Sequence, residues 1–249
     1  MALPSRMEVR LRRWLLVAGA VVLLGGGLRA QDSLDKIQKE ANLALARGAK
    51  NGPDLEEIER LVGRARDLSI DQKGEEGGLA AAQWVLNLAS FLSEERQSEL
   101  FAETMDAIVE SWLDHDGLAE VVLTRLANPP PFLAKAAGEY FDWIARDSKS
   151  KPVQAACKYT AATKEAANAG SVAEAKKMVA KLEKLKAEIG TLPAAFGQTY
   201  AQMLDELIDG LKVVGTPAQE IAGKDLDGVA FKLSDYKGKV VLLDFWGYW

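Results

Sequence analysis

The 249-residue sequence predicts a mainly α-helical protein, either a helical bundle or an irregular helical-repeat stack. Residues 31–213 are rich in alanine, leucine, glutamate and lysine and poor in β-branched runs, which favours helix. Apolar residues recur there at helical spacing, and residues that start or stop helices separate the apolar stretches. Because no fixed repeat period is visible, tetratricopeptide repeats are not predicted.

Residues 1–30 have the pattern of a secretory signal peptide. A basic stretch precedes the apolar residues Trp14 to Leu24, and Leu28-Arg29-Ala30 fits a cleavage site. The uncharged run is shorter than the roughly eighteen residues of a membrane-spanning helix, so we expect cleavage and no stable membrane span afterwards. An uncleaved anchor is the main alternative, Arg12-Arg13 is a weak twin-arginine signal, and the lack of a following cysteine excludes a bacterial lipoprotein. The expected location is the periplasm or cell envelope of a bacterium.

The composition argues against several classes of ligand. The formal charge is −5, and cleavage after Ala30 removes five arginines and one glutamate, which leaves −9. Neither nucleic acid nor an anionic membrane would attract such a chain, so we expect no nucleic-acid partner. One histidine and one cysteine exclude a multi-histidine metal site and an intramolecular disulfide within this sequence. We expect no metal and no cofactor.

Four apolar stripes mark helices within residues 31–213, and each must be buried against another helix. The stripes are Leu55, Ile58, Leu61, Val62, Ala65 and Leu68; Trp84, Val85, Leu88, Phe91 and Leu92; Phe101, Met105, Ile108, Val109 and Trp112; and Phe196, Tyr200, Met203, Leu204, Leu207, Ile208 and Leu211. About eight helices joined by short links are expected, which favours antiparallel neighbours.

Several short patterns divide this helical region. Asn51-Gly52-Pro53 and Asn128-Pro129-Pro130-Pro131 each end one helix and precede the next. Ser171 and Glu174 have the spacing of a capping box. The lysines that follow, interleaved with glutamates up to Glu188, predict a helix side that faces water.

The helical region contains two residues that could suggest chemistry. His115 lies between Asp114 and Asp116, but successive helical residues point about 100° apart, so three in a row cannot share one ion. We interpret them as a solvated helix end that is closed by Gly117. Cys157 lies among alanines, where a small buried thiol packs well, and a redox role is the alternative.

The pattern changes after the last helix, at Gly215-Thr216-Pro217. Asp227-Gly228 predicts a hairpin between Glu220–Leu226 and Val229–Leu233. A further turn leads into Val240–Trp246, a short apolar run that is typical of a strand covered on both faces.

Residues 214–249 resemble a known family. The residues concerned are Gly215-Thr216-Pro217-Ala218, Gly223-Lys224-Asp225-Leu226-Asp227-Gly228, Leu233-Ser234-Asp235-Tyr236-Lys237-Gly238-Lys239-Val240-Val241-Leu242-Leu243 and Asp244-Phe245-Trp246-Gly247-Tyr248-Trp249. Together they resemble the opening of a thioredoxin-like domain, and most closely the exported TlpA/ResA-like thiol–disulfide oxidoreductases within the redoxin and AhpC/TSA group. The resemblance implies that residues 214–249 are the first strands of an incomplete α/β domain.

The resemblance also implies what the redox site would contain. In that family Cys-x-x-Cys follows directly after the position of Trp249, so no catalytic residue is expected in this sequence, which we interpret as a fragment. Asp244, Phe245, Trp246 and Trp249 would flank the site, with Asp244 matching a buried acid that moves protons for the cysteine pair. Without its covering helix, the alternative for Asp244 is an exposed strand end. The implied partners are protein thiols and disulfides.

Two other functions stay open. A peroxiredoxin-type peroxidase belongs to the same superfamily, but its Pro-x-x-x-Thr/Ser-x-x-Cys context does not match Asp244–Trp249. A non-catalytic helical envelope scaffold that carries an inactive redoxin remnant is the second. Because Val240–Phe245 would leave apolar side chains uncovered, we predict that residues 214–249 do not form a native thioredoxin fold by themselves.

Overall fold

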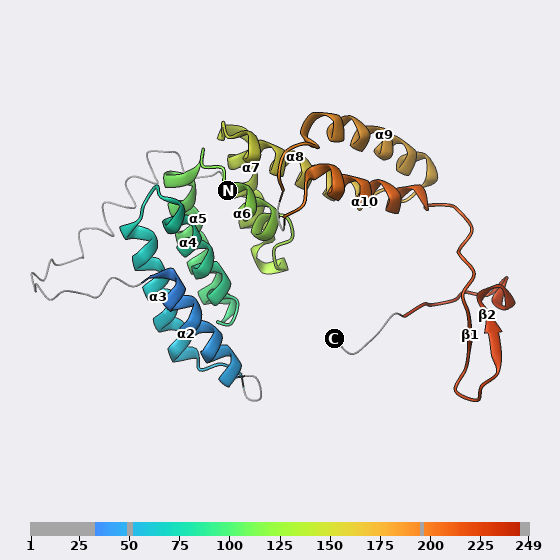
Figure 1. Ribbon diagram of the computed structural model, residues 1–249, viewed down its shortest axis with the longest axis horizontal. Helices are drawn as coiled ribbons and strands as arrows, with labels where there is room; N and C mark the ends of the chain where they lie inside the picture. Colours follow the sequence, from blue (N-terminus) through green and yellow to red (C-terminus); the bar gives the residue numbers. More distant parts are fainter. Residues whose placement is uncertain (1–32, 49–51, 195–196, 245–249) are drawn as a thin grey trace, which may run out of the picture.

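The computed structural model describes residues 33–48, 52–194 and 197–244, and its described part is mainly helical, as the sequence predicts (Figure 1). The expected signal peptide lies outside the described residues. The helices are α2 (Leu34–Arg47), α3 (Leu55–Asp71), α4 (Glu76–Ala89), α5 (Glu94–Trp112), α6 (Leu118–Val121), the π-helix η1 (Val122–Leu126), the 3-10 helix η2 (Pro131–Leu133), α7 (Ala134–Asp147), α8 (Lys151–Ala166), α9 (Val172–Ile189) and α10 (Tyr200–Lys212). Within these residues no helix combines the length and the apolar character needed to cross a bilayer.

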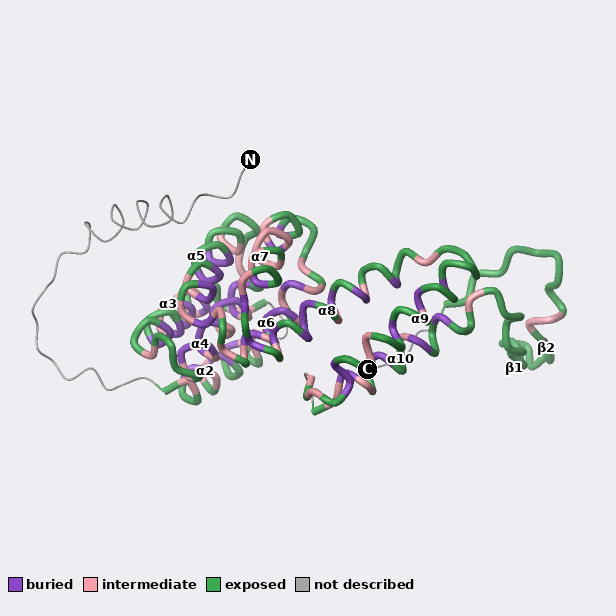
Figure 2. Tube along the Cα trace, turned by 90° about the horizontal axis from the view of Figure 1, so that it is seen from above, coloured by how far each residue is buried: buried purple, intermediate pink, exposed green. Residues whose placement is uncertain are grey.

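The helices form an irregular stack. Most contacts join helices that are neighbours in sequence, and Figure 1 shows the helices following one another from α2 to α10. One group of buried apolar residues, which includes Ile37, Leu61 and Leu88, joins α2, α3 and α4. A second group continues from α4 and α5 through α8 to α10. The buried residues therefore lie on the faces that successive helices turn toward one another, and the opposite faces of the helices are exposed (Figure 2).

Most of the predicted apolar stripes are buried, but two helix boundaries differ. The α4 helix ends at Ala89, so Phe91 lies in the following turn and is exposed. The chain turns here because the side chain of Ser93 caps α5 by accepting a hydrogen bond from the backbone N–H of Arg96. Phe196 lies outside the described residues, and α10 begins at Tyr200.

Both predicted helix breaks are confirmed, and the first is followed by a side-chain cap, whereas η2 and α7 after the second break have none. After Pro53, Asp54 Oδ1 accepts hydrogen bonds from the backbone N–H groups of the next two glutamates, at 3.0 and 3.3 Å, and so starts α3. Ser171 Oγ accepts from Glu174 N at 3.2 Å, as a capping box requires. The carboxylate of Glu174, however, accepts from Gly170 N at 3.1 Å, one residue before the expected position.

The predicted hairpin is present, whereas the strand predicted at Val240–Trp246 is wrong for its described part. Strands β1 (Ala222–Lys224) and β2 (Ala230–Lys232) pair antiparallel, with Gly223 opposite Phe231. Residues 240–244 form no strand, and Val240 and Leu242 are 103% and 92% exposed. A strand is absent there because none of the described segments pairs with this run or covers it. Residues 245 and 246 lie outside the described part.

Candidate functional site

The C-terminal hairpin has a turn that is organised by one aspartate. Asp225 Oδ1 accepts hydrogen bonds from the backbone N–H groups of Asp227 at 3.0 Å and Val229 at 2.9 Å. The backbone of Asp225 also pairs with Val229 and Gly228. Gly228 has φ +79°, which a side chain would disfavour. The local sequence therefore specifies this turn without help from the helices.

The residues after β2 are held to the start of the hairpin. Glu220 Oε1 accepts a hydrogen bond from Ser234 N at 3.0 Å, and the hydrogen bonding of Ser234 lowers the pKa of this carboxyl. Asp235 Oδ2 accepts from Lys232 N at 2.9 Å, which closes a short 3-10 turn, η4 (Leu233–Tyr236). The chain then passes Gly238, at φ +81°, into the apolar run.

The structure does not bring the predicted flanking residues into a site. Asp244 is exposed, and its side chain has no hydrogen-bond or ion-pair partner among the described residues. Phe245, Trp246 and Trp249 lie outside the described part of the chain. Asp244 is thus exposed, as the second interpretation expects, but it does not lie at the end of a strand.

Cys157 occupies a packing position in α8. Its side chain is 5% exposed within the second core, and burial raises the pKa of its thiol to about 11. The thiolate, which is the nucleophile in disulfide exchange, is therefore disfavoured at neutral pH. These features support the packing interpretation over a redox role.

Asp114 and Asp116 have a structural role that the sequence analysis missed. Asp114 Oδ1 accepts a hydrogen bond from Lys149 N at 2.6 Å, and Asp116 Oδ1 accepts from Ser150 Oγ at 2.7 Å. Both bonds tie the turn after α5 to the link before α8. Gly117 does not close α5 but precedes α6, and it donates its N–H to His115 Nδ1 at 3.1 Å. The sequence gives only a weak indication of these hydrogen bonds, namely Ser148 and Ser150 just before α8.

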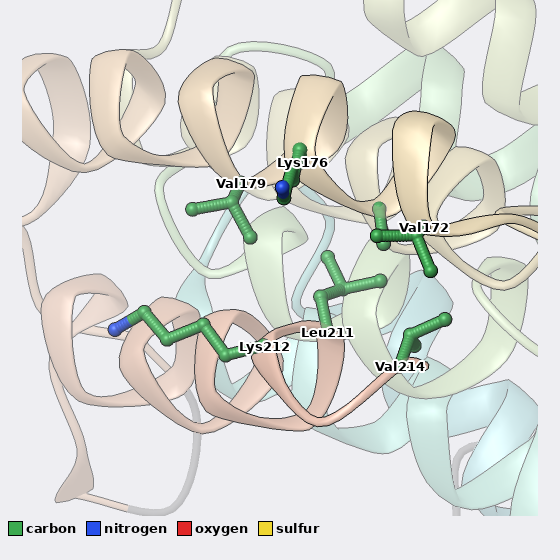
Figure 3. A pocket seen from close by; sticks show the side chains of 7 residues that line it. Val172, Lys176, Val179, Leu211, Lys212 and Val214 are labelled. Atoms are coloured by element: carbon green, nitrogen blue, oxygen red, sulfur yellow. The ribbon is translucent and has the colours of Figure 1, made fainter. Parts of the chain in front are cut away.

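A small hollow between α9 and α10 is a second feature that the sequence did not indicate. Its volume is about 200 Å³, and Figure 3 shows side chains of both helices around it. It is lined by Val172, Ala175, Lys176, Val179, Leu211, Lys212 and Val214. We refer to these seven residues as the α9–α10 hollow. Elsewhere in the described residues, no group of three or more histidines, cysteines or carboxylates lies together as metal ligands would.

Comparisons with known proteins do not assign the chain to a family. No family model matches it, and neither a curated protein nor a solved structure is significantly similar to it.

Proposed function

We propose that residues 214–249 are the opening of a thioredoxin-like domain and that the whole protein exchanges thiols and disulfides with other proteins of the bacterial cell envelope. The motif order quoted above supports this proposal. A hairpin, a short turn closed by Gly238 and an apolar run ending at Asp244 follow one another along the described chain. The signal-like residues 1–30 agree with an oxidising compartment, where disulfide chemistry is used.

The observation that carries the proposal is the exposure of the apolar run. Val240, Val241, Leu242 and Leu243 are all exposed in the structure. Each large apolar side chain left in water forgoes about 1.5–3 kcal/mol of burial free energy. A run of this kind, β-branched at its start, is expected where the strands and helices of a larger domain cover it. A thioredoxin-like sheet would supply that cover.

The proposed chemistry assigns one role to the described residues, proton transfer by Asp244, and places the redox cysteines after Trp249. A Cys-x-x-Cys pair directly after Trp249 would supply a thiolate that attacks a partner's disulfide sulfur and expels a partner thiolate. The second cysteine would then attack the mixed disulfide, which releases the reduced partner and leaves the pair oxidised. Asp244 would accept and return the proton of the second thiol. Cys157, with its raised thiol pKa, takes no part.

The proposal is tested on the coding sequence and on the protein that it encodes. We expect the codons after Trp249 to specify Cys-x-x-Cys, and the encoded protein to reduce insulin disulfides in the presence of dithiothreitol. Replacing either cysteine of that pair by serine should abolish the reduction, whereas Cys157→Ala should leave it unchanged. A sequence without the pair, or activity that depends on Cys157, would contradict the proposal.

A non-catalytic helical scaffold is the second candidate, and it requires only what the described residues contain, a stack of helices in which Cys157 is buried. The only cysteine of the sequence is neither exposed nor activated. Both candidates predict that the 249-residue chain, which has one cysteine, has no insulin-reductase activity, so the codons after Trp249 are what distinguish them. If the reading frame stops after Trp249, the scaffold replaces the oxidoreductase as the preferred function.

A further inference from the structure

We propose that residues 239–244 pair as an antiparallel β-strand with the same residues of a second copy of this chain. Val240 and Leu242 are 103% and 92% exposed, whereas Val241 and Leu243 are 41% and 48% exposed. This alternation is that of an extended chain, in which successive side chains point to opposite sides. No backbone hydrogen bond joins residues 240–244 to another described residue, so an extended apolar edge is open to a partner.

The charges at the two ends of this segment point to a second copy as the partner. Lys239 lies over the ring of Tyr236, and neither Lys239 nor Asp244 has an ion-pair partner in the part of the chain that the structure describes. An antiparallel register with Val241 opposite Leu242 of the other copy places Lys239 of each copy opposite Asp244 of the other. Opposite charges that face each other across two strands stabilise the pairing. Parallel pairing in register would instead place like charges together.

The composition of residues 239–244 is typical of segments that pair between chains. The segment has no net charge, no proline and no glycine, and Val240 and Val241 are β-branched. The hairpin of another copy is a poorer partner, because β1 and β2 are three residues long and end in Lys224 and Lys232. Short edge strands that carry lysine resist such pairing.

The expected association is weak and depends on concentration. A two-stranded ribbon of this length is only marginally stable, although further copies can add to its free edges. We therefore expect a Kd of roughly tens to hundreds of micromolar, and a dilute chain in which the segment stays open. This inference goes beyond the redox proposal and does not depend on it, because the pairing needs no thiol.

The test is sedimentation equilibrium of the 249-residue chain at about 5 to 500 µM, with infrared spectra at the same concentrations. We expect monomers at the lowest concentration, and association that increases together with the amide I signal of antiparallel strands. Lys239→Glu places like charges opposite each other at both ends of the pairing, so it should raise the Kd about fivefold or more. Asp244→Lys should do the same. Circular dichroism should show unchanged helix content, because both residues are exposed and lie outside the helical stack.

The double variant Lys239→Glu/Asp244→Lys restores opposite charges, so its Kd should return to within about twofold of the unmodified value. In parallel pairing all these chains would keep like charges together, so the loss and the recovery identify the antiparallel register. Lys237→Glu, the same charge change on the exposed turn before the segment, is the matched control and should change the Kd less than about twofold.

Leu242→Pro should abolish the association, because proline removes a backbone donor from the strand. Four results would each overturn the proposal: monomers at every concentration, equal effects of the changes at 237 and 239, a double variant that associates no better than the single ones, or association that survives the proline.

Discussion

At the scale of single residues, burial decides the properties of the one thiol. Cys157 lies on a face of α8 that packs in the second core, and burial in apolar surroundings disfavours its charged form. The alanines on both sides of Cys157 indicated a packing role, but only the structure shows that the sulfur is inaccessible.

The first prediction concerns the reactivity of Cys157. In the folded 249-residue chain, dithiobis-nitrobenzoate at pH 8 should label the thiol slowly, because the group is buried and its pKa is about 11. In denaturant the same thiol should react rapidly and stoichiometrically. Rapid labelling of the folded chain would contradict the packing role.

Two buried hydroxyl groups lead to a second prediction. Thr160 Oγ1 and Tyr200 Oη are buried and have no hydrogen-bond partner in the described residues. Because an unsatisfied buried hydroxyl costs about 1–3 kcal/mol, Tyr200→Phe should leave the free energy of unfolding unchanged or raise it. Urea unfolding measures this change, with Tyr140→Phe as the control. Tyr140 donates to Asp106 at 2.7 Å, so its variant should lose stability.

At the scale of secondary-structure elements, hydrogen bonds join the segment after α5 to the segment before α8. Ser150 caps α8, since its Oγ accepts from Val153 N at 3.3 Å, and the same hydroxyl donates to Asp116. Ser150→Ala should therefore lower the free energy of unfolding by about 1–2 kcal/mol. Ser98→Ala in α5 is the control, because the hydroxyl of Ser98 only donates to a carbonyl of its own helix on an exposed face. Equal stability of the two variants would show that the contact between the links has no energetic role.

An ion pair between α2 and α3 predicts a dependence of stability on pH. Arg64 binds the carboxylate of Glu40, and this hydrogen bond lowers the pKa of Glu40 in the folded chain. A carboxyl with a depressed folded pKa stabilises the fold above its unfolded pKa, and this contribution disappears as the pH falls through the folded pKa. The stability lost between neutral and acidic pH should therefore be smaller in Glu40→Gln than in the unmodified chain, as thermal unfolding across that range would show.

At the scale of the whole molecule, the helical stack and the hairpin segment are nearly independent. From residue 215 onward the described chain is mostly exposed, and Gly215, at the start of this segment, lies against Val172 of α9. Removing residues 216–249 should therefore change the Tm of the helical part by less than about 2 °C. Differential scanning calorimetry of the two chains measures this. A larger drop would mean that the C-terminal segment packs on the helices.

Hydrogen exchange gives a further prediction for the apolar run. Amides of residues 240–244 should exchange within seconds in the 249-residue chain, because they are exposed and belong to no sheet. Amides in α3 and α5 should be protected by comparison. Protection across 240–244 would show that the run is covered without any further chain.

The sequence by itself determined the helical character, the cap at Ser171 and the hairpin, because each depends on residues within a few positions of one another. Because the sequence contains one cysteine, it also excludes an intramolecular disulfide within these 249 residues. Only the tertiary structure decided that Asp114 and Asp116 hold a distant link, that Cys157 is inaccessible and that α9 and α10 leave a hollow beside Lys176. These features join residues far apart in sequence, and their geometry follows from how whole helices pack. The apolar run at residues 240–244 has a sequence typical of a strand but forms none in this structure. A strand requires a neighbouring strand that supplies hydrogen bonds, and the described residues contain none beside this run.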